Sequence, residues 1–367
     1  CFAAIDDSDR TVRELVNGNE VLLAYAVSIC LKSRLHNDAL FAEMASLCER
    51  CGHLDSSIEF LQQIRNKDIV SVIASRFTAS TEQEMERLYV RAGLQSPLFY
   101  STEAINSQSV DPTTAAKYFA LGKQHEQAAM VCIKHLKDQF SQETWNWEVI
   151  RTMSLSMHCI DATKLSNENR SLLLAYASFI GGQEAIWKGY HTVAPFLLQN
   201  AKVLSKHHHT TDFSVPVSYL DYMICLAYSF FDRVEAENII HQVLDRQSIP
   251  QSSPLFHSIQ ALKTRLSKLR SSSSSSSSSV MSQPSLRNTV IPNSSNLPLR
   301  SIDGIRTKSY ITKREAHLPL FLLNEYDFPD WSTPTDKTKY YVSLSEAIMW
   351  RNVNPFCPLN NGSKLRL

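Results

Sequence analysis

Residues 38–64 read DALFAEMASLCERCGHLDSSIEFLQQI, and this stretch decides the fold class of the chain. Apolar and small residues at helical spacing predict one face of a first helix: Phe41, Met44, Ala45 and Cys48. Gly52 follows where the chain must reverse, because glycine readily adopts the backbone conformation that ends a helix. The matching face of a second helix is predicted at Leu54, Ser57, Leu61 and Ile64. Such a hairpin cannot bury its apolar face alone, so it needs neighbours stacked on both sides.

The same order of helix, glycine and helix recurs further along the chain. Thr81 and Glu84 predict a capping box at the start of a helix that ends at Gly93. Asp111, followed by a proline, predicts the start of another helix, and Gly122 is the predicted turn after it. The three glycines of these hairpins are unevenly spaced, which predicts degenerate rather than regular repeats.

The helical pattern continues to about residue 270. Residues 166–187 predict a pair of helices interrupted at Gly181 and Gly182. Further helices are predicted over 217–231, 234–245 and 255–269. We therefore expect an all-α fold over residues 1–270, arranged as a superhelical solenoid of degenerate helix hairpins.

The composition changes after residue 270. Residues 271–309 open with an unbroken serine tract and are rich in Ser, Pro and Asn, which predicts a disordered linker. Residues 310–367 are predicted as a short aromatic segment with one helix near 343–351, where Ser343 and Glu346 form a capping box. We expect this segment to dock either on the chain's own helices or on a partner.

The bulk composition is that of an ordinary folded chain. It has 367 residues, 43% of them apolar, and a net charge of +1, which selects neither nucleic acid nor membrane. Because the sequence begins with Cys1, we expect it to be the C-terminal piece of a longer protein. Most of its cysteines lie in apolar helical windows, so we expect reduced thiols and a cytoplasmic location, with the cilium as an alternative. No apolar run reaches the ~18 residues of a transmembrane helix.

Three groups of residues are candidates for chemistry, and each has a simpler structural interpretation. Cys48 and Cys51, followed by a histidine, have the spacing of half a zinc site, but zinc needs four ligands and no second such pair exists. The consecutive histidines 207–209 do not converge on one metal ion. The adjacent His158 and Cys159 point in different directions on a helix. Since no phosphate-binding or hydrolase motif occurs either, we expect no enzyme activity, no metal and no cofactor.

Two features are candidates for binding a partner. Tyr118, Trp145 and Trp147 are our guesses for protein-binding residues, because aromatic side chains dominate interface hot spots; burial in the helical core is the alternative. Basic residues scattered over 297–315 could contact RNA or acidic lipid, or belong to a solvated linker. No nucleic-acid-binding fold is recognisable beside them, so we expect other proteins as partners and no nucleic acid.

Three phrases carry a resemblance to a known family: ALFAEMASLCERCGHLDSSIEFLQQI, MERLYVRAGL and AAKYFALGKQHEQAAMVCIKH. They resemble the tetratricopeptide-like C-terminal arm of large WD-repeat scaffold proteins, over roughly residues 10–270. Intraflagellar-transport and coat-type proteins have similar units after their β-propellers. The resemblance implies propellers before this chain and a role in assembling a multiprotein complex without catalysis. The chain lacks the Cys-rich C-terminal zinc module of the transport proteins, which weighs against a ciliary role.

We therefore expect a non-catalytic scaffold that mediates protein–protein interaction. One alternative is a subunit of an intraflagellar-transport or vesicle-coat-like assembly. The other is an RNA- or lipid-associated adaptor that acts through the basic linker.

Overall fold

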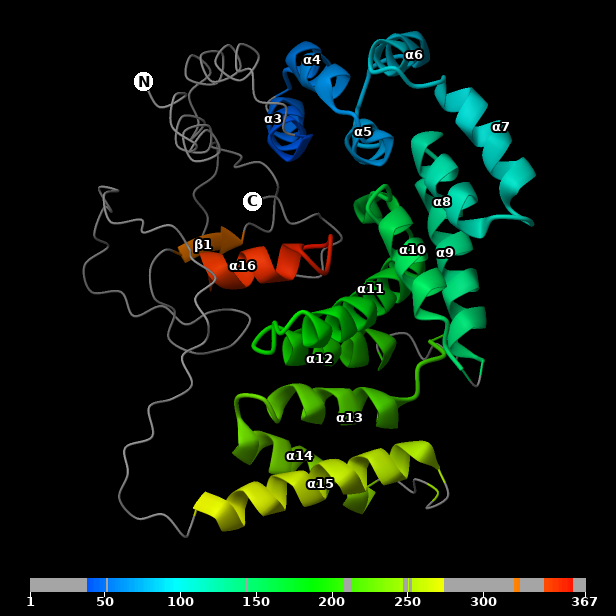
Figure 1. The fold of residues 1–367 in the computed structure, drawn as a ribbon. Helices are drawn as coiled ribbons and strands as arrows, with labels where there is room; N and C mark the ends of the chain where they lie inside the picture. The colour runs from blue at the N-terminus through cyan, green and yellow to red at the C-terminus, as the bar shows by residue number, and fades with distance from the viewer. Residues whose placement is uncertain are drawn as a thin grey trace, which may run out of the picture. The chain divides into compact units, whose positions relative to one another are not determined.

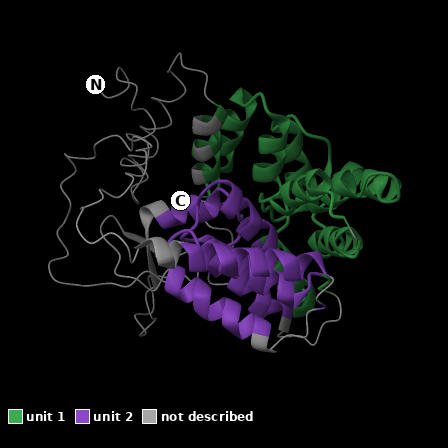
Figure 2. Cartoon of the chain, turned by 60° about the horizontal axis from the view of Figure 1, so that its bottom comes forward, with its two compact units in different colours: residues 1–177, 207–214, 360–364 green, residues 178–206, 215–359, 365–367 purple. Residues whose placement is uncertain are grey.

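The computed structural model describes residues 38–50, 52–142, 144–206, 213–246, 250, 253–273, 320–323 and 340–358. Over these residues the chain is helical apart from one pair of short strands (Figure 1). It divides into two compact units (Figure 2). Unit 1 comprises residues 1–177, 207–214 and 360–364, and unit 2 comprises residues 178–206, 215–359 and 365–367. The division falls inside one helix, α11 (Asn167–Trp187).

Unit 1 is built from consecutive helices that pack on their neighbours in sequence. They are α3 (Asp38–Arg50), α4 (Leu54–Gln63), α5 (Lys67–Ala74), α6 (Glu82–Arg91), α7 (Pro97–Ser107), α8 (Pro112–Leu121), α9 (His125–Phe140) and α10 (Trp147–Met157), followed by the 3₁₀ turn η2 (Ala162–Lys164). Close contacts join α3 with α4, α7 with α8, and α8 with α9. The hairpins predicted from the sequence at 38–64 and 111–137 are thus present as α3–α4 and α8–α9.

Unit 2 contains the second part of α11 and the elements that follow it. These are α12 (Ala194–Lys206), α13 (Val217–Tyr228), α14 (Arg233–Arg246), α15 (Pro254–Ser273), β1 (Leu320–Leu323), β2 (Tyr340–Ser343) and α16 (Leu344–Arg351). Helices α12 to α15 follow one another as successive layers (Figure 1).

The strand pair is the departure from the predicted all-α fold. Strand β1 pairs antiparallel with β2, with Leu320 opposite Ser343, and α16 contacts both strands. Only one helix was expected in residues 310–367. Neither strand was predicted, because each is only four residues long, too short for a period-two pattern to stand out.

The turns between helices use glycine in two different ways. Gly52 and Gly93 have φ of +78° and +75°, so they adopt the left-handed conformation predicted for them. Gly122 does not, because its φ is −73°, and the left-handed residue is the next one, Lys123, at +64°. Gly122 is instead required for space: a Cβ there would lie 2.3 Å from the Ser101 hydroxyl oxygen of α7.

Side-chain caps begin several of the helices. The Thr81 hydroxyl accepts a hydrogen bond from the Glu84 amide at 3.2 Å, as the predicted capping box requires. The Glu84 carboxylate bonds the Ser80 amide at 3.0 Å, one residue before the predicted partner. Asp111 accepts from the amides of Thr113 and Thr114, which confirms it as the cap of α8.

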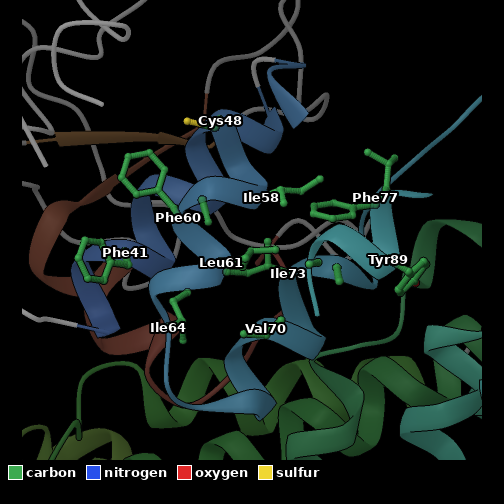
Figure 3. Close-up of a cluster of buried hydrophobic side chains, with 14 of the residues drawn as sticks. Phe41, Cys48, Ile58, Phe60, Leu61, Ile64, Val70, Ile73, Phe77 and Tyr89 are labelled. Carbon is green, nitrogen blue, oxygen red and sulfur yellow. The ribbon is translucent and has the colours of Figure 1, made fainter. Parts of the chain in front are cut away.

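One hydrophobic core of unit 1 lies between α3, α4, α5 and α6 (Figure 3). Its buried side chains come from these helices and the turns beside them, among them Phe41, Cys48, Ile58, Phe60, Leu61, Ile73, Phe77 and Tyr89. The buried Ser57 hydroxyl of α4 donates to the Ala45 carbonyl of α3 at 2.8 Å, so this polar group is satisfied. The apolar faces predicted for the first hairpin therefore meet each other and the next helices.

The predicted helix break at Gly181 and Gly182 is wrong. Helix α11 continues through both residues to Trp187. A Cβ on Gly182 would lie 2.7 Å from Leu198 Cγ in α12, and a Cβ on Gly181 would lie 2.8 Å from the Val353 carbonyl oxygen. These glycines allow other elements to pack closely against α11. A Gly-Gly pair predicts a turn from the sequence alone, and that prediction does not consider close packing.

Unit 2 has a core of its own between α13, α14 and α15. The buried side chains are Cys225, Ala236, Ile240, Val243, Ile259, Leu262 and Leu266. Three of them, Ile259, Leu262 and Leu266, come from α15, where the sequence predicted a helix over 255–269. None of the helices in the described part of the chain combines the length and the apolarity that a membrane span requires.

Candidate protein-interaction surfaces

The two predicted tryptophans come together in an aromatic cluster of unit 1. Both rings pack against Phe140, with centroids 5.0 Å from Trp145 and 6.2 Å from Trp147, and the tryptophans lie 6.0 Å apart. The Trp145 indole N–H donates to the Phe140 carbonyl at 3.2 Å. Phe140 also stacks on the buried Tyr176 at 5.7 Å. Both tryptophans are half-buried, so much of their surface already serves packing within unit 1.

Tyr118 has different neighbours. Its ring centroid lies 5.3 Å from that of Tyr100, which in turn lies 6.4 Å from that of Tyr89. The Tyr89 hydroxyl donates to the Leu121 carbonyl at 2.8 Å, and burial raises the pKa of Tyr89. The three residues guessed from the sequence therefore belong to two separate clusters, each tied into the packing of unit 1.

Lys123 forms an unusual polar joint between α5 and the turn after α8. Its ammonium group donates to the carbonyls of Ala74, Ser75 and Phe77 at 3.2, 2.8 and 2.8 Å, which satisfies the carboxyl end of α5. It also lies 5.3 Å from the centre of the Tyr89 ring. Burial lowers the pKa of Lys123 to about 7, although its three carbonyl acceptors favour the charged form. The contacts define a structural joint, and none of them points to a substrate.

Helix α7 presents the clearest exposed apolar face in unit 1, and the sequence analysis missed it. Leu98 and Ile105 are 69% and 65% exposed, and they lie seven residues apart on one side of the helix. Tyr100 and Ala104 are buried on the opposite side. The Ser96 hydroxyl caps the helix by accepting from the Phe99 amide at 3.2 Å, directly before Pro97. That Ser-Pro pair is the sequence signal that could have revealed α7.

A second surface, in unit 2, is covered by the end of the chain. We call residues 346–357 the C-terminal segment. Trp350 of this segment is fully buried in a cluster with small and aliphatic residues of the preceding helices: Ala185, Val193, Ala194, Leu197 and Ala227. Its ring packs edge-on against Phe196 at 5.5 Å. The C-terminal segment therefore docks on the chain's own helices, one of the two expected modes.

The cysteines of the described residues behave as core residues. Cys48, Cys132, Cys159, Cys225 and Cys357 are all buried. Burial raises the pKa of the Cys225 thiol to about 12, and it also raises that of Cys132, so both thiols are protonated near neutral pH.

Only some of the residues considered as metal ligands are described by the structure. Cys51 and the histidines 207–209 lie outside the described residues. Within the ranges that the structure describes, no group of three or more His, Cys, Asp or Glu side chains is placed to hold a metal ion. The basic stretch 297–315 also lies outside them.

Comparison with known proteins adds no identification. No family model matches the chain, and no solved structure matches it.

Proposed function

We propose that this chain is a non-catalytic scaffold that binds other proteins through its helix hairpins. The observation that carries the proposal is the exposed apolar face of α7, formed by Leu98 and Ile105. Apolar side chains at this spacing on an exposed helix face are typical of helix-mediated recognition. The proposal includes a tetratricopeptide-like, solenoid arrangement of the hairpins, which the packing of α3 on α4 and of α8 on α9 supports.

The chemistry of α7 defines the kind of partner. The helix carries a single charged residue, Glu103, and Thr102 lies between the two apolar side chains on the same face. A face that is apolar and almost uncharged favours a partner that contributes an apolar helix face of its own. We infer an amphipathic helix with apolar side chains at matching spacing.

The underside of α7 is held rigidly enough to present that face. Gly122 lets the turn after α8 approach the first turn of α7, and the Ser101 hydroxyl bonds the Pro97 carbonyl at 3.1 Å. The phenol of Tyr100 accepts a hydrogen bond from the Gln95 amide at 3.4 Å. A preformed face of this kind loses little conformational entropy on binding.

The family assignment is part of the proposal. We infer that the chain is the helical C-terminal arm of a WD-repeat scaffold in the cytoplasm, from the phrases that resemble such arms and from cysteines that lie buried in the helical core. A subunit of an intraflagellar-transport or coat-like assembly is a narrower form of the same role. Tyr118, Trp145 and Trp147 stay as guesses for additional contact residues.

Site-specific crosslinking tests the proposal. A photoreactive amino acid replaces Ile105 in the full chain, and a second chain carries it at Met130, an exposed apolar residue of α9 (55% exposed). We expect a protein partner crosslinked from position 105 through an amphipathic helix, and its loss when Leu98→Glu is added. Equal crosslinking from both positions, or none from position 105, would overturn the proposal.

A further inference from the structure

The C-terminal segment is joined by several hydrogen bonds between its own residues. The Trp350 indole N–H donates to the Phe356 carbonyl at 2.7 Å, and the Phe356 amide donates to the Asn354 side chain at 3.0 Å. The amides of Val353 and Asn354 both donate to the Trp350 carbonyl, which closes the end of α16. These bonds lie within the segment, so its helix end and its Asn-Pro-Phe turn are organised by local contacts.

The receiving surface has an apolar centre and a polar rim. The indole enters the cluster lined by Ala185, Ala194 and Leu197, where small side chains leave room for a large ring. At the rim, the Lys188 ammonium donates to the Asn352 carbonyl at 3.0 Å, and the Asn352 amide donates to the Tyr190 hydroxyl at 3.5 Å. This arrangement is the usual one for a surface that binds a peptide.

Gly181 admits the backbone of the segment. A Cβ at this position would lie 2.8 Å from the Val353 carbonyl oxygen and 3.4 Å from Asn354 Cβ. Helix interiors disfavour glycine by about 1 kcal/mol relative to alanine, so a glycine here needs a packing reason. The close approach of the segment supplies that reason.

Unit 2 keeps a core that the segment does not enter. The buried cluster of α13, α14 and α15, which includes Ile240, Val243 and Ile259, contains no residue of the C-terminal segment. The segment is also remote in sequence, because α15 ends at Ser273 and the predicted linker intervenes. A surface and its occupant joined in this way behave as a receptor and a tethered ligand, with an effective concentration on the order of millimolar.

We propose that the C-terminal segment is a separable peptide ligand of unit 2, which occupies in cis a binding site for segments of the same chemistry. That chemistry is a helical turn that presents a tryptophan, followed by an Asn-Pro-aromatic turn. The site is then closed in the resting chain and opens when the segment leaves. This inference goes beyond the scaffold role of α7 and does not depend on it.

The test measures whether the segment binds in trans to the full chain. The probe is a fluorescein-labelled synthetic peptide of residues 340–358, followed by fluorescence anisotropy. The receptors are the wild-type chain, Trp350→Ala, and Trp350→Ala combined with Gly181→Ala. The tethered wild-type segment competes with the probe, whereas Trp350→Ala weakens that competitor without changing the receiving surface.

We expect the probe to bind Trp350→Ala at least about tenfold more tightly than the wild-type chain, because the cis occupant has been weakened. Adding Gly181→Ala should weaken binding again by about tenfold or more, since the new methyl group meets the Val353 carbonyl. A probe that itself carries Trp350→Ala is the matched control and should not bind. Absence of binding to the Trp350→Ala chain, or equal binding to all three chains, overturns the proposal.

A second measurement covers the case in which Trp350→Ala fails to fold. A protease site is inserted after residue 300 of the otherwise wild-type full chain, within the predicted linker, and the chain is cleaved. We expect excess unlabelled peptide 340–358 to displace the C-terminal fragment, with the helical circular dichroism of the remainder retained. Two results would overturn the proposal: the C-terminal fragment stays bound at every peptide concentration, or the rest of the chain unfolds when the fragment leaves. Either result would show that the C-terminal segment is an integral part of the core.

Discussion

The α7 face of unit 1 and the Trp350 site of unit 2 are both apolar helix surfaces, but only one of them is covered by the chain. Leu98 and Ile105 stay exposed on α7, whereas Trp350 is buried against aliphatic residues such as Ala194 and Leu197. The difference lies in what covers each surface: the C-terminal segment covers the one in unit 2, and the two α7 side chains face outward. We propose an outside partner for the α7 face only.

The largest effect should come from emptying the covered site. Trp350→Ala should lower the free energy of unfolding of unit 2 by about 3 to 5 kcal/mol, the usual cost of truncating a buried tryptophan. Urea denaturation of the full chain measures it. Trp187→Ala, at a half-exposed tryptophan in the same unit, is the control and should cost about 0.5 kcal/mol. If Trp350→Ala and Trp187→Ala lower the free energy of unfolding equally, the burial of Trp350 makes no specific contribution to stability.

The next effect concerns the Lys123 joint between α5 and the turn after α8. Lys123→Met should lower the free energy of unfolding by about 2 to 3 kcal/mol, because three carbonyls at the end of α5 lose their hydrogen-bond donor. Denaturant titration at pH 7 measures it. Lys134→Met, on the neighbouring helix α9, is the matched control. If both variants lose the same amount, the joint does not hold α5 to the turn after α8.

The same lysine predicts a pH dependence with a definite sign. Its pKa of about 7 in the folded chain lies below the ordinary lysine value of 10.5, so between these values the unfolded chain binds more protons. The free energy of unfolding should therefore rise as the pH increases from about 7 toward 10.5. The slope should be smaller in Lys123→Met. An identical slope in both chains would show that this lysine does not titrate in that window.

The paired glycines of α11 sharpen the comparison further. Gly181→Ala meets the docked segment and Gly182→Ala meets Leu198 of α12, while each gains about 1 kcal/mol of helix propensity. We expect a net loss of about 1 to 2 kcal/mol for Gly182→Ala, because overpacking between helices has no easy relief. Gly181→Ala should instead release the segment, measured as faster proteolysis of residues 344–358. The roles assigned to the two glycines would be contradicted if Gly181→Ala lowered the free energy of unfolding while Gly182→Ala sped up proteolysis of residues 344–358.

The smallest effect on stability should appear on the open face. Leu98→Glu with Ile105→Glu should change the free energy of unfolding by about 0.5 kcal/mol or less, because both side chains already contact water. Thermal denaturation measures it. A large loss would mean that the α7 face is covered within the chain after all.

Local features of the sequence predicted most of the elements in unit 1. The caps at Thr81 and Asp111 and the left-handed glycines at 52 and 93 depend on neighbouring residues only, so they could be read directly. Helix α7 was missed although Ser96-Pro97 carries the same kind of signal as Asp111-Pro112.

The covered site could not be predicted in the same way. The reason for Gly181 is the Val353 carbonyl, which is distant in sequence, so Gly-Gly looked like a turn. The aromatic content of the C-terminal segment predicted docking but not its place, since the alanine, valine and leucine residues around Trp350 carry no distinctive signal. Gly122 lies in the turn predicted for it, but the reason for a glycine there could not be predicted, because its close neighbour is Ser101 of another helix.

The most direct test of the scaffold proposal compares partner binding through the α7 face with partner binding at an exposed apolar residue of α9, Met130. The full chain, Leu98→Glu with Ile105→Glu, and Met130→Glu are each used for affinity capture from native cells, and the partner is mapped by crosslinking. The account predicts one protein, held through an amphipathic helix, that the α7 variant loses and the Met130→Glu control retains. Retention by all three chains, or the absence of any such protein, would contradict it.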